Sequence, residues 1–134
     1  MIEVRVFKDL KRKFLPYKEI REVIVTAFVG EKITNANLNV ILVDDEQILE
    51  LNNKYLGHNF TTDVITFDFN EKTIAGEIYI SVDTAERQAK EYNVSLKNEL
   101  KRLAIHGGLH LTGYDDNNIE NREIMHHLEN KYLN

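Results

Sequence analysis

Apolar and polar residues follow two different periods along this chain, and each period predicts one kind of element. Four stretches show the alternation or the short continuous apolar run of a β-strand. They are IEVRV, ANLNVILVDD, DVITFDF and GEIYISV, which begin at residues 2, 36, 63 and 76. Five longer stretches place apolar residues on a helical face, and they cover about residues 17–30, 45–55, 84–92, 96–111 and 119–133.

Polar residues at the ends of these stretches predict where the helices begin and end. Asp44, with Gln47 three residues later, has the pattern of a capping box. Asp83 and Ser95 are the expected N-caps of the third and fourth helices, since short polar side chains accept hydrogen bonds from the first helical turn. Gly113 is expected just after the fourth helix, in the left-handed conformation that glycine adopts easily.

The elements follow one another in the order β-α-β-α-β-β-α-α-α, which is typical of an α+β protein. This order predicts a mixed four-stranded sheet packed with helices. The chain has 134 residues and contains no internal repeat, low-complexity tract or linker. Residues 1–134 are therefore expected to form a single domain.

Composition narrows the class of protein. Hydrophobic residues make up 43% of the chain and charged residues 29%, as in ordinary soluble globular proteins. No apolar run approaches the ~18 residues of a transmembrane helix, and the first residues, MIEVRVFKDLKRKF, lack the apolar core of a secretory signal. The absence of cysteine excludes disulfides, thiolate ligands and cysteine nucleophiles. It also agrees with the cytoplasmic location that we expect.

The net charge of −5 argues against a protein covered by nucleic acid, because phosphate contacts require lysine and arginine. A local cluster is nevertheless sufficient. The strongest basic cluster lies near the N-terminus and consists of Lys8, Lys11, Arg12 and Lys13. Two interpretations stay open for it, a solvated surface or a contact with a polyanionic substrate.

The stretch 96–111 is expected to be the buried central helix of the domain. Because a helix turns by about 100° per residue, Leu103 and Gly107 lie on one face, while Ile105 and Leu109 lie roughly opposite. A helix that is apolar on both sides is buried.

His106 and His110 share a third face of this helix. Residues four apart are neighbours on a helix surface, so both imidazoles can reach one point in space. Two nitrogen ligands of one metal ion need this arrangement, and the alternative is a pair of hydrogen-bonded core histidines. Gly107 and Gly108 cost the helix about 1 kcal/mol each relative to alanine. We interpret them as admitting other backbone close to a crowded site.

Asp116 is the candidate third ligand, because a turn at Gly113 and Tyr114 would bring the chain back past the end of the helix. Two histidines and one carboxylate form a common catalytic set that leaves a fourth position for water. Imidazole favours Zn²⁺, Ni²⁺ or Fe²⁺ over Mg²⁺. His126 and His127 in the last helix are alternative third ligands or, on a second interpretation, surface residues.

One absence excludes a class of enzyme. Peptidases of the H-E-x-x-H type carry their general base directly after the first histidine, and this chain has Gly107 at that position. Peptidase activity is therefore not expected.

The stretch from His106 to Asp116, HGGLHLTGYDD, resembles the signature H-G-x-L-H-L-x-G-Y-D-H of the YbeY family of bacterial metal-dependent endoribonucleases. Ten of the eleven positions agree when the two free positions are counted. The segments VDDEQILELNNKYLGHNFTTDVITFDF and AGEIYIS also resemble segments of this family. The resemblance implies an α+β fold with a zincin-like central helix. It also implies the processing of ribosomal RNA, especially at the 3′ end of the small-subunit RNA.

The same resemblance implies that His106, His110 and Asp116 bind one divalent metal ion, with zinc as the expected ion. The family has a third histidine where this chain has Asp116, and an arginine thought to face RNA where this chain has Leu56. A ribosomal RNA precursor is the expected substrate. Proteins of the small ribosomal subunit are expected partners, and no membrane contact is expected.

Several further residues are candidates for catalysis or for contact with substrate. Asp63, in a TDV stretch that matches the family, is either a catalytic carboxylate or a loop-fixing hydrogen-bond acceptor. Glu77 faces either the site or water. The candidates for binding substrate are His58, Lys11, Arg12 and Lys13, with an exposed loop residue as the alternative for His58. The aromatic residues for which stacking on bases competes with core packing are Tyr55, Phe60, Phe67 and Phe69.

The working hypothesis for the chemistry is hydrolysis. A metal ion on the three ligands lowers the pKa of a bound water toward ~7 and neutralises charge on phosphoryl oxygens. Two other functions stay open. A non-catalytic ribosome-assembly factor would keep the ion as a structural or vestigial feature, and a metallohydrolase acting on a small substrate would use the same ligands.

Overall fold

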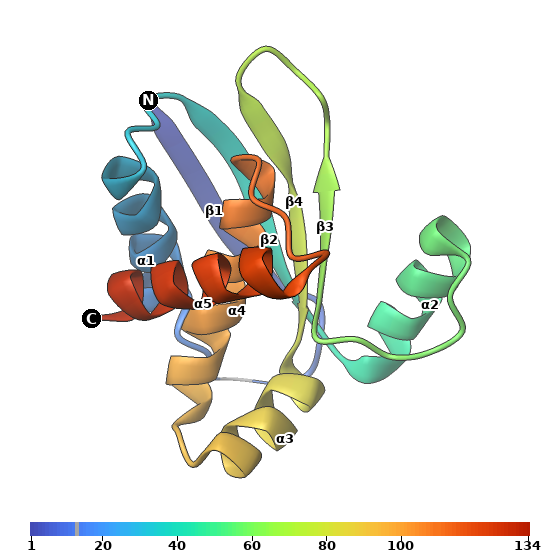
Figure 1. Ribbon diagram of the computed structural model, residues 1–134. Coiled ribbons are helices and arrows are strands. Elements are labelled where there is room, and N and C mark those ends of the chain that lie inside the picture. Colours follow the sequence, from blue (N-terminus) through green and yellow to red (C-terminus); the bar gives the residue numbers. More distant parts are fainter. Residues whose placement is uncertain (13) are drawn as a thin grey trace.

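The computed structural model describes residues 1–12 and 14–134, and their elements follow the predicted order (Figure 1). The strands are β1 (Ile2–Lys8), β2 (Ala36–Val43), β3 (Val64–Asp68) and β4 (Ile74–Ser81). The helices are α1 (Tyr17–Gly30), α2 (Asp45–Leu56), α3 (Val82–Tyr92), α4 (Leu96–Leu111) and α5 (Ile119–Leu133). The α+β class is confirmed. Within the described residues, every helix is too short or too polar to span a membrane.

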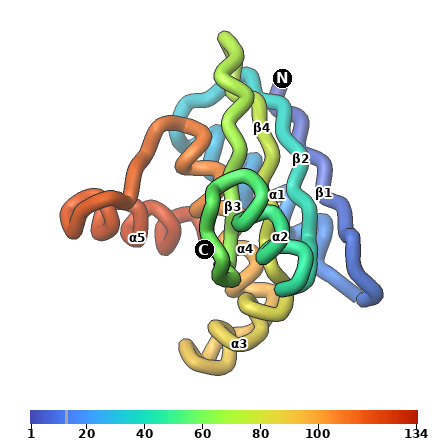
Figure 2. The backbone as a smooth tube through the Cα atoms, turned by 90° about the vertical axis from the view of Figure 1, so that its right-hand side faces the viewer, coloured from blue at the N-terminus to red at the C-terminus, as the bar shows by residue number. Residues whose placement is uncertain are grey.

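The four strands form one mixed sheet in the order β1-β2-β4-β3. β1, β2 and β4 run parallel, and β3 is an antiparallel edge strand, with Val64 opposite Ile80 and Asp68 opposite Gly76. Figures 1 and 2 show α1, α4 and α5 on one side of the sheet and α2 on the other. The face toward α1 and α4 is buried along β2 and β4, whereas the opposite face is buried chiefly near α2.

The main core fills the space between the sheet and the helices α1 and α4. Its large, fully buried side chains include Phe28 of α1, Leu42 of β2, Ile78 of β4 and Leu109 of α4. A smaller core on the opposite face lies under α2 and consists of Val43, Ile48 and Ile65 with partly buried neighbours.

Helix α4 lies at the centre of the fold, as its two apolar faces predict. It packs against α1, α3, α5 and the strands β3 and β4. Ser95 caps its first turn, since the Ser95 hydroxyl accepts from the backbone N of Asn98 at 3.0 Å. At its other end, Gly113 adopts φ +109° and donates its N–H to the carbonyl O of His110 at 3.1 Å. Both predicted ends of this helix are confirmed.

The N-cap predicted for α3 is wrong. Ser81, not Asp83, caps this helix, and its hydroxyl accepts from the backbone N of Thr84 at 3.2 Å. The Asp83 carboxylate instead accepts from the backbone N of Asp45 at 3.0 Å, in the first turn of α2. β4 passes directly into α3. The helix therefore begins one residue before Asp83, the predicted cap.

The interpretation of the two glycines of α4 is also wrong. A Cβ atom on Gly107 would lie 2.7 Å from Cγ2 of Ile78 in β4, and one on Gly108 would lie 3.2 Å from Cε1 of Phe28 in α1. Both neighbours are fully buried side chains and not backbone. The glycines therefore allow close packing of α4 on the sheet and on α1.

Candidate metal centre

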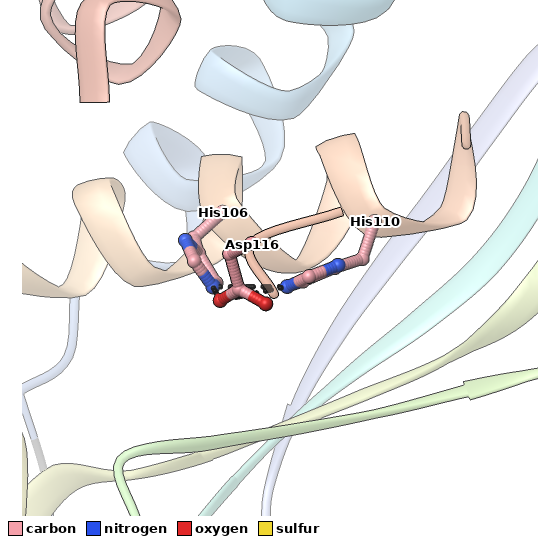
Figure 3. Close-up of side chains that lie close together, drawn as sticks. All are labelled: His106, His110 and Asp116. Carbon is pink, nitrogen blue, oxygen red and sulfur yellow. Dashed lines mark hydrogen bonds and ion pairs between the residues drawn. The ribbon is translucent and has the colours of Figure 1, made fainter. Parts of the chain in front are cut away.

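His106, His110 and Asp116 converge on one point at the surface of α4 (Figure 3). The Nε2 atoms of the two histidines are 3.1 Å apart. Oδ2 of Asp116 lies 3.3 Å from Nε2 of His106 and 3.5 Å from Nε2 of His110. The three side chains are 23%, 26% and 42% exposed, respectively, so a ligand from solution can reach them.

These separations match what a tetrahedral ion requires. With bonds of about 2.0–2.1 Å, two ligand atoms around a tetrahedral Zn²⁺ lie roughly 3.3–3.4 Å apart. The three measured separations, 3.1, 3.3 and 3.5 Å, bracket that value. The ligand atoms thus already have the spacing that such an ion needs.

The protons on both imidazoles are placed so that Nε2 is free to bind a cation. Nδ1 of His110 lies 2.9 Å from the carbonyl O of Tyr114, which can only accept, so Nδ1 carries the hydrogen. Nδ1 of His106 lies 2.7 Å from Oε2 of Glu129, and Nη1 of Arg102 binds Oε1 of the same carboxylate at 3.0 Å. In the neutral rings, both Nε2 lone pairs therefore face the same point.

The electrostatic field at this point favours a positive charge. Burial lowers the pKa of His106, but the hydrogen bond and the charge of Glu129, with the charges of Asp116 and Asp63, outweigh it and raise the pKa. Three lone-pair atoms this close repel one another unless a proton or a cation lies between them. Two imidazoles and one carboxylate form a donor set for a zinc-type ion. The residues present therefore fit a divalent ion.

Asp116 reaches the histidines because Tyr114 fixes the turn that precedes it. The backbone N of Tyr114 donates to the carbonyl O of Leu109 at 3.1 Å, and its own carbonyl accepts from His110. Its hydroxyl donates to Oε1 of Glu31 at the end of α1. The turn is thus tied both to α4 and to a helix that lies far away in the sequence.

The three ligands lie where two surface grooves meet. The first, which we term the helix groove, lies between α3, α4 and α5, and its lining includes Gln88, Glu99, Arg102, Arg122 and Glu129. The second, the loop groove, lies beside β3 and the α2–β3 loop, and its lining includes Leu56, His58, Phe60, Thr66 and Asp68. Asp63, His106 and Asp116 line both grooves.

Two of the predicted substrate or catalytic residues therefore lie next to the ligands. His58 lines the loop groove, and Asp63 lines both grooves. Oδ2 of Asp63 accepts from Nε2 of Gln88 at 3.2 Å, so the carboxylate has a loop-fixing bond as well as access to the grooves. Leu56 also lines the loop groove.

The described residues of the predicted basic cluster lie elsewhere. The described residues Lys11 and Arg12 line neither groove, and the Arg12 guanidinium is paired with the carboxylate of Glu86 in α3. Lys13 lies outside the described residues. A role of this cluster in binding RNA stays a prediction.

The structure also places the residues for which two interpretations were open. Glu77 lies on the face of β4 that points away from α4, since its strand neighbour Ile78 packs against Gly107, and Glu77 accepts from the hydroxyl of Tyr79 at 3.2 Å. His126 and His127 are exposed on α5, and the metal-ligating group found in the described residues does not include them.

The aromatic candidates lie in different environments, some packed against other rings and some exposed. Phe67 packs edge-on between Tyr55 and Tyr79, with ring centroids 5.5 and 5.7 Å away. Phe69 is 51% exposed, so core packing does not describe it. Phe60 is 56% exposed and lines the loop groove.

Sequence reasoning did not identify the carboxylate that supports His106. Glu129 lies on α5, far from the histidines in sequence, so its spacing from them does not predict a contact. Its position on the buried stripe of α5, with Met125 and Tyr132, could have indicated a buried partner. A carboxylate among apolar positions of a helix indicates a buried partner, because a buried charge requires compensation.

Comparison with known proteins identifies the family of this chain. Residues 8–134 match the family described as "Endoribonuclease YbeY". A protein of that name from Chloroherpeton thalassium is 37% identical over 133 residues, which cover 98% of this chain and 94% of the relative. One from Bacteroides thetaiotaomicron is 40% identical over 110 residues, which cover 81% of this chain and 79% of the relative.

A solved structure has the same fold. The solution structure of a protein from Thermotoga maritima superposes with a TM-score of 0.71 at 33% sequence identity, and the match covers 98% of this chain and 87% of that one. The match to the family extends over nearly the whole chain and includes the three ligands and both grooves. This chain therefore belongs to the YbeY family of endoribonucleases.

Proposed function

We propose that this chain is a zinc-dependent endoribonuclease that matures ribosomal RNA in the cytoplasm, with cleavage near the 3′ end of the small-subunit RNA. Residues 1–134 would constitute one metal-dependent hydrolase domain, and proteins of the small ribosomal subunit would be its partners. Family membership supports the nuclease activity. The structural observation that carries the proposal is the convergence of three lone-pair atoms where two surface grooves meet.

The ligands are held in place by the protein itself. An ion bound by His106, His110 and Asp116 would supply a Lewis acid beside the phosphodiester and a lowered pKa for water. Glu129 orients the ring of His106, and the carbonyl of Tyr114 orients the ring of His110. Such partners fix the tautomer of a metal-binding histidine and raise its basicity.

Asp63 is the residue to which we assign proton transfer. Its carboxylate lines both grooves beside the ligands, and its charge acts on His106. The bond from Gln88 to Oδ2 holds the carboxylate in place. An ionised carboxylate next to the reacting phosphodiester accepts the proton of the attacking water.

We assign phosphate contact in the helix groove to Arg122, which lines this groove, because guanidinium groups bind phosphate oxygens. Arg102 also lines the groove, but its Nη1 and Nη2 already donate to Glu129 and Asn130. In a chain with a net charge of −5, cations at the site matter more than the total charge. The RNA backbone would therefore enter along α4 and α5.

Replacement of one ligand tests the proposal. His110→Ala should abolish both the binding of zinc, measured by elemental analysis of the purified protein, and the cleavage of single-stranded RNA. His127→Ala is the matched control, because this exposed histidine of α5 lies outside the ligand cluster, and it should leave both properties intact. If His110→Ala loses the metal but still cleaves RNA in a nuclease-free preparation, the assignment is wrong.

A chelator titration distinguishes catalysis from a structural role of the ion. The proposed enzyme should lose cleavage while its circular dichroism spectrum stays unchanged, because the ligands are held by protein contacts that do not involve the ion. Unfolding on removal of the metal would instead favour the non-catalytic assembly factor.

The RNA specificity requires a separate experiment. Cells that carry only the His110→Ala protein should accumulate small-subunit RNA with an extended 3′ end, measured by northern hybridisation or by sequencing of RNA 3′ ends. Normal 3′ ends in these cells would refute the role in ribosomal RNA maturation. The nuclease activity itself is tested separately, by the cleavage assay.

A further inference from the structure

The loop that joins α2 to β3 presents two aromatic rings at the loop groove. The rings of His58 and Phe60 are stacked, with centroids 5.0 Å apart and planes inclined by 14°. Phe60 is 56% exposed, so most of its ring lies in water. A large apolar side chain that is exposed inside a groove next to a candidate active site indicates a surface for binding a ligand.

Helix α2 holds this loop in place. Asn52 is buried, with 2% exposure, and its Nδ2 donates to the carbonyl O of Phe60 at 2.8 Å. The backbone N of His58 donates to the carbonyl O of Asn52 at 3.2 Å. Between them, Gly57 ends α2 in the left-handed region at φ +69°. Because the backbone is fixed before a ligand arrives, binding to the two rings costs little additional ordering.

The chemistry of the loop groove favours ring faces over phosphate groups. The three metal ligands line this groove together with His58 and Phe60. Its described lining residues include the acidic Asp63 and Asp68 and no lysine or arginine. Phosphate pairing therefore contributes little on this side of the ligands, whereas bases of a single strand stack on aromatic side chains.

We propose that the His58–Phe60 pair is a stacking platform for one unpaired nucleobase of an RNA whose phosphodiester lies at the metal ligands. This inference rests on the proposed function, which places a phosphodiester there. A base inside a duplex has both faces covered by its neighbours, so the platform accepts a base only from a single strand. Stacking tolerates every base, because every base has a π-face.

The test is the binding of a fluorescent hexamer of 2′-O-methyladenosine to the metal-loaded protein, followed by anisotropy, with the integrity of the hexamer checked by electrophoresis. Phe60→Ala should weaken binding roughly 5- to 150-fold, the range for loss of one base–aromatic stack. Phe60→Trp should restore the affinity of the parent. The matched control is Phe69→Ala, an exposed phenylalanine outside the described lining of both grooves, which should change binding by less than about twofold.

A second hexamer, built of abasic 2′-O-methylribose phosphates, separates stacking from phosphate contact. It should bind the parent and Phe60→Ala equally. The platform is refuted if the adenosine hexamer also binds both proteins equally, or if Phe60→Ala loses affinity for both hexamers to the same extent. No cleavage is scored in this experiment. Failure of the proposed function would appear in the His110→Ala cleavage assay, and failure of the platform only in hexamer binding.

Discussion

Gly107 and Gly108 are adjacent in α4, yet alanine should lower the stability of the protein only at Gly107. Both are interior helical residues, where alanine is favoured over glycine by about 1 kcal/mol. They differ in what the new methyl group meets. At Gly107 it meets the branched side chain of Ile78 in β4, and at Gly108 it meets the edge of the Phe28 ring in α1.

The distances at Gly107 determine that alanine lowers the free energy of unfolding at this position. The new Cβ would lie 2.7 Å from Cγ2, 3.2 Å from Cδ1 and 3.3 Å from Cγ1 of Ile78. Ile78 is fully buried on β4, which pairs with strands on both sides, so it has no free space to move into. Overpacking of this kind costs about 1–3 kcal/mol. After the helical gain of about 1 kcal/mol, Gly107→Ala should lower the free energy of unfolding by roughly 0–2 kcal/mol.

At Gly108 the closest contact is 3.2 Å to Cε1 of Phe28, and the next two are 3.7 and 3.9 Å. A shift of the ring by a few tenths of an ångström relieves the first contact, and the other two are ordinary van der Waals distances. Gly108→Ala should therefore be neutral or stabilise the protein by up to about 1 kcal/mol. Because the helical gain is common to both, the two variants should differ by the overpacking cost at Gly107, roughly 1–3 kcal/mol.

Urea denaturation of both variants and the parent, followed by far-ultraviolet circular dichroism, measures these free energies. Equal slopes with denaturant would show that the variants differ in stability and not in the extent of unfolding. Gly107→Ala should have the lowest midpoint. A Gly107→Ala protein as stable as Gly108→Ala would refute the view that contact with the sheet requires the first glycine.

Three further outcomes follow from the contacts described. Glu129→Gln should weaken the affinity for Zn²⁺ about 10- to 100-fold, measured by competition with a chromophoric chelator, because the carboxylate behind a ligating histidine raises its basicity; an unchanged Kd would exclude that role. The pKa of Glu99 is raised, because burial and the charges of Asp63 and Glu129 raise it by more than the charge of Arg102 lowers it. The stability that comes with protonation of Glu99 is complete below the ordinary pKa of about 4.3 and is lost as the pH rises through the raised pKa. Glu99→Gln should therefore gain thermal stability over the parent as the pH increases from about 4 to 8, and a constant difference between the two melting temperatures would contradict this. Asp44→Ala should cost about 1 kcal/mol in urea denaturation through loss of the α2 capping box and leave zinc affinity unchanged, and a loss of zinc binding would show that α2 is coupled to the metal centre.

The sequence by itself determined the order of the elements and the grouping of the three candidate ligands. Hydrophobic periods and cap residues are local properties, so the order of strands and helices and both ends of α4 were predicted from them. The spacing of His106 and His110 is equally local, because one helical turn brings them to the same face. The turn at Gly113 was sufficient to predict that Asp116 would join them.

Only the tertiary structure decided what surrounds these ligands. Glu129 reaches His106 from α5, and Glu31 anchors the turn that carries Asp116 from the end of α1. The partners of Gly107 and Gly108 come from β4 and α1. Each of these contacts joins segments that are distant in the sequence. Their geometry depends on how whole elements pack across the core, and no period or spacing within one element contains that information.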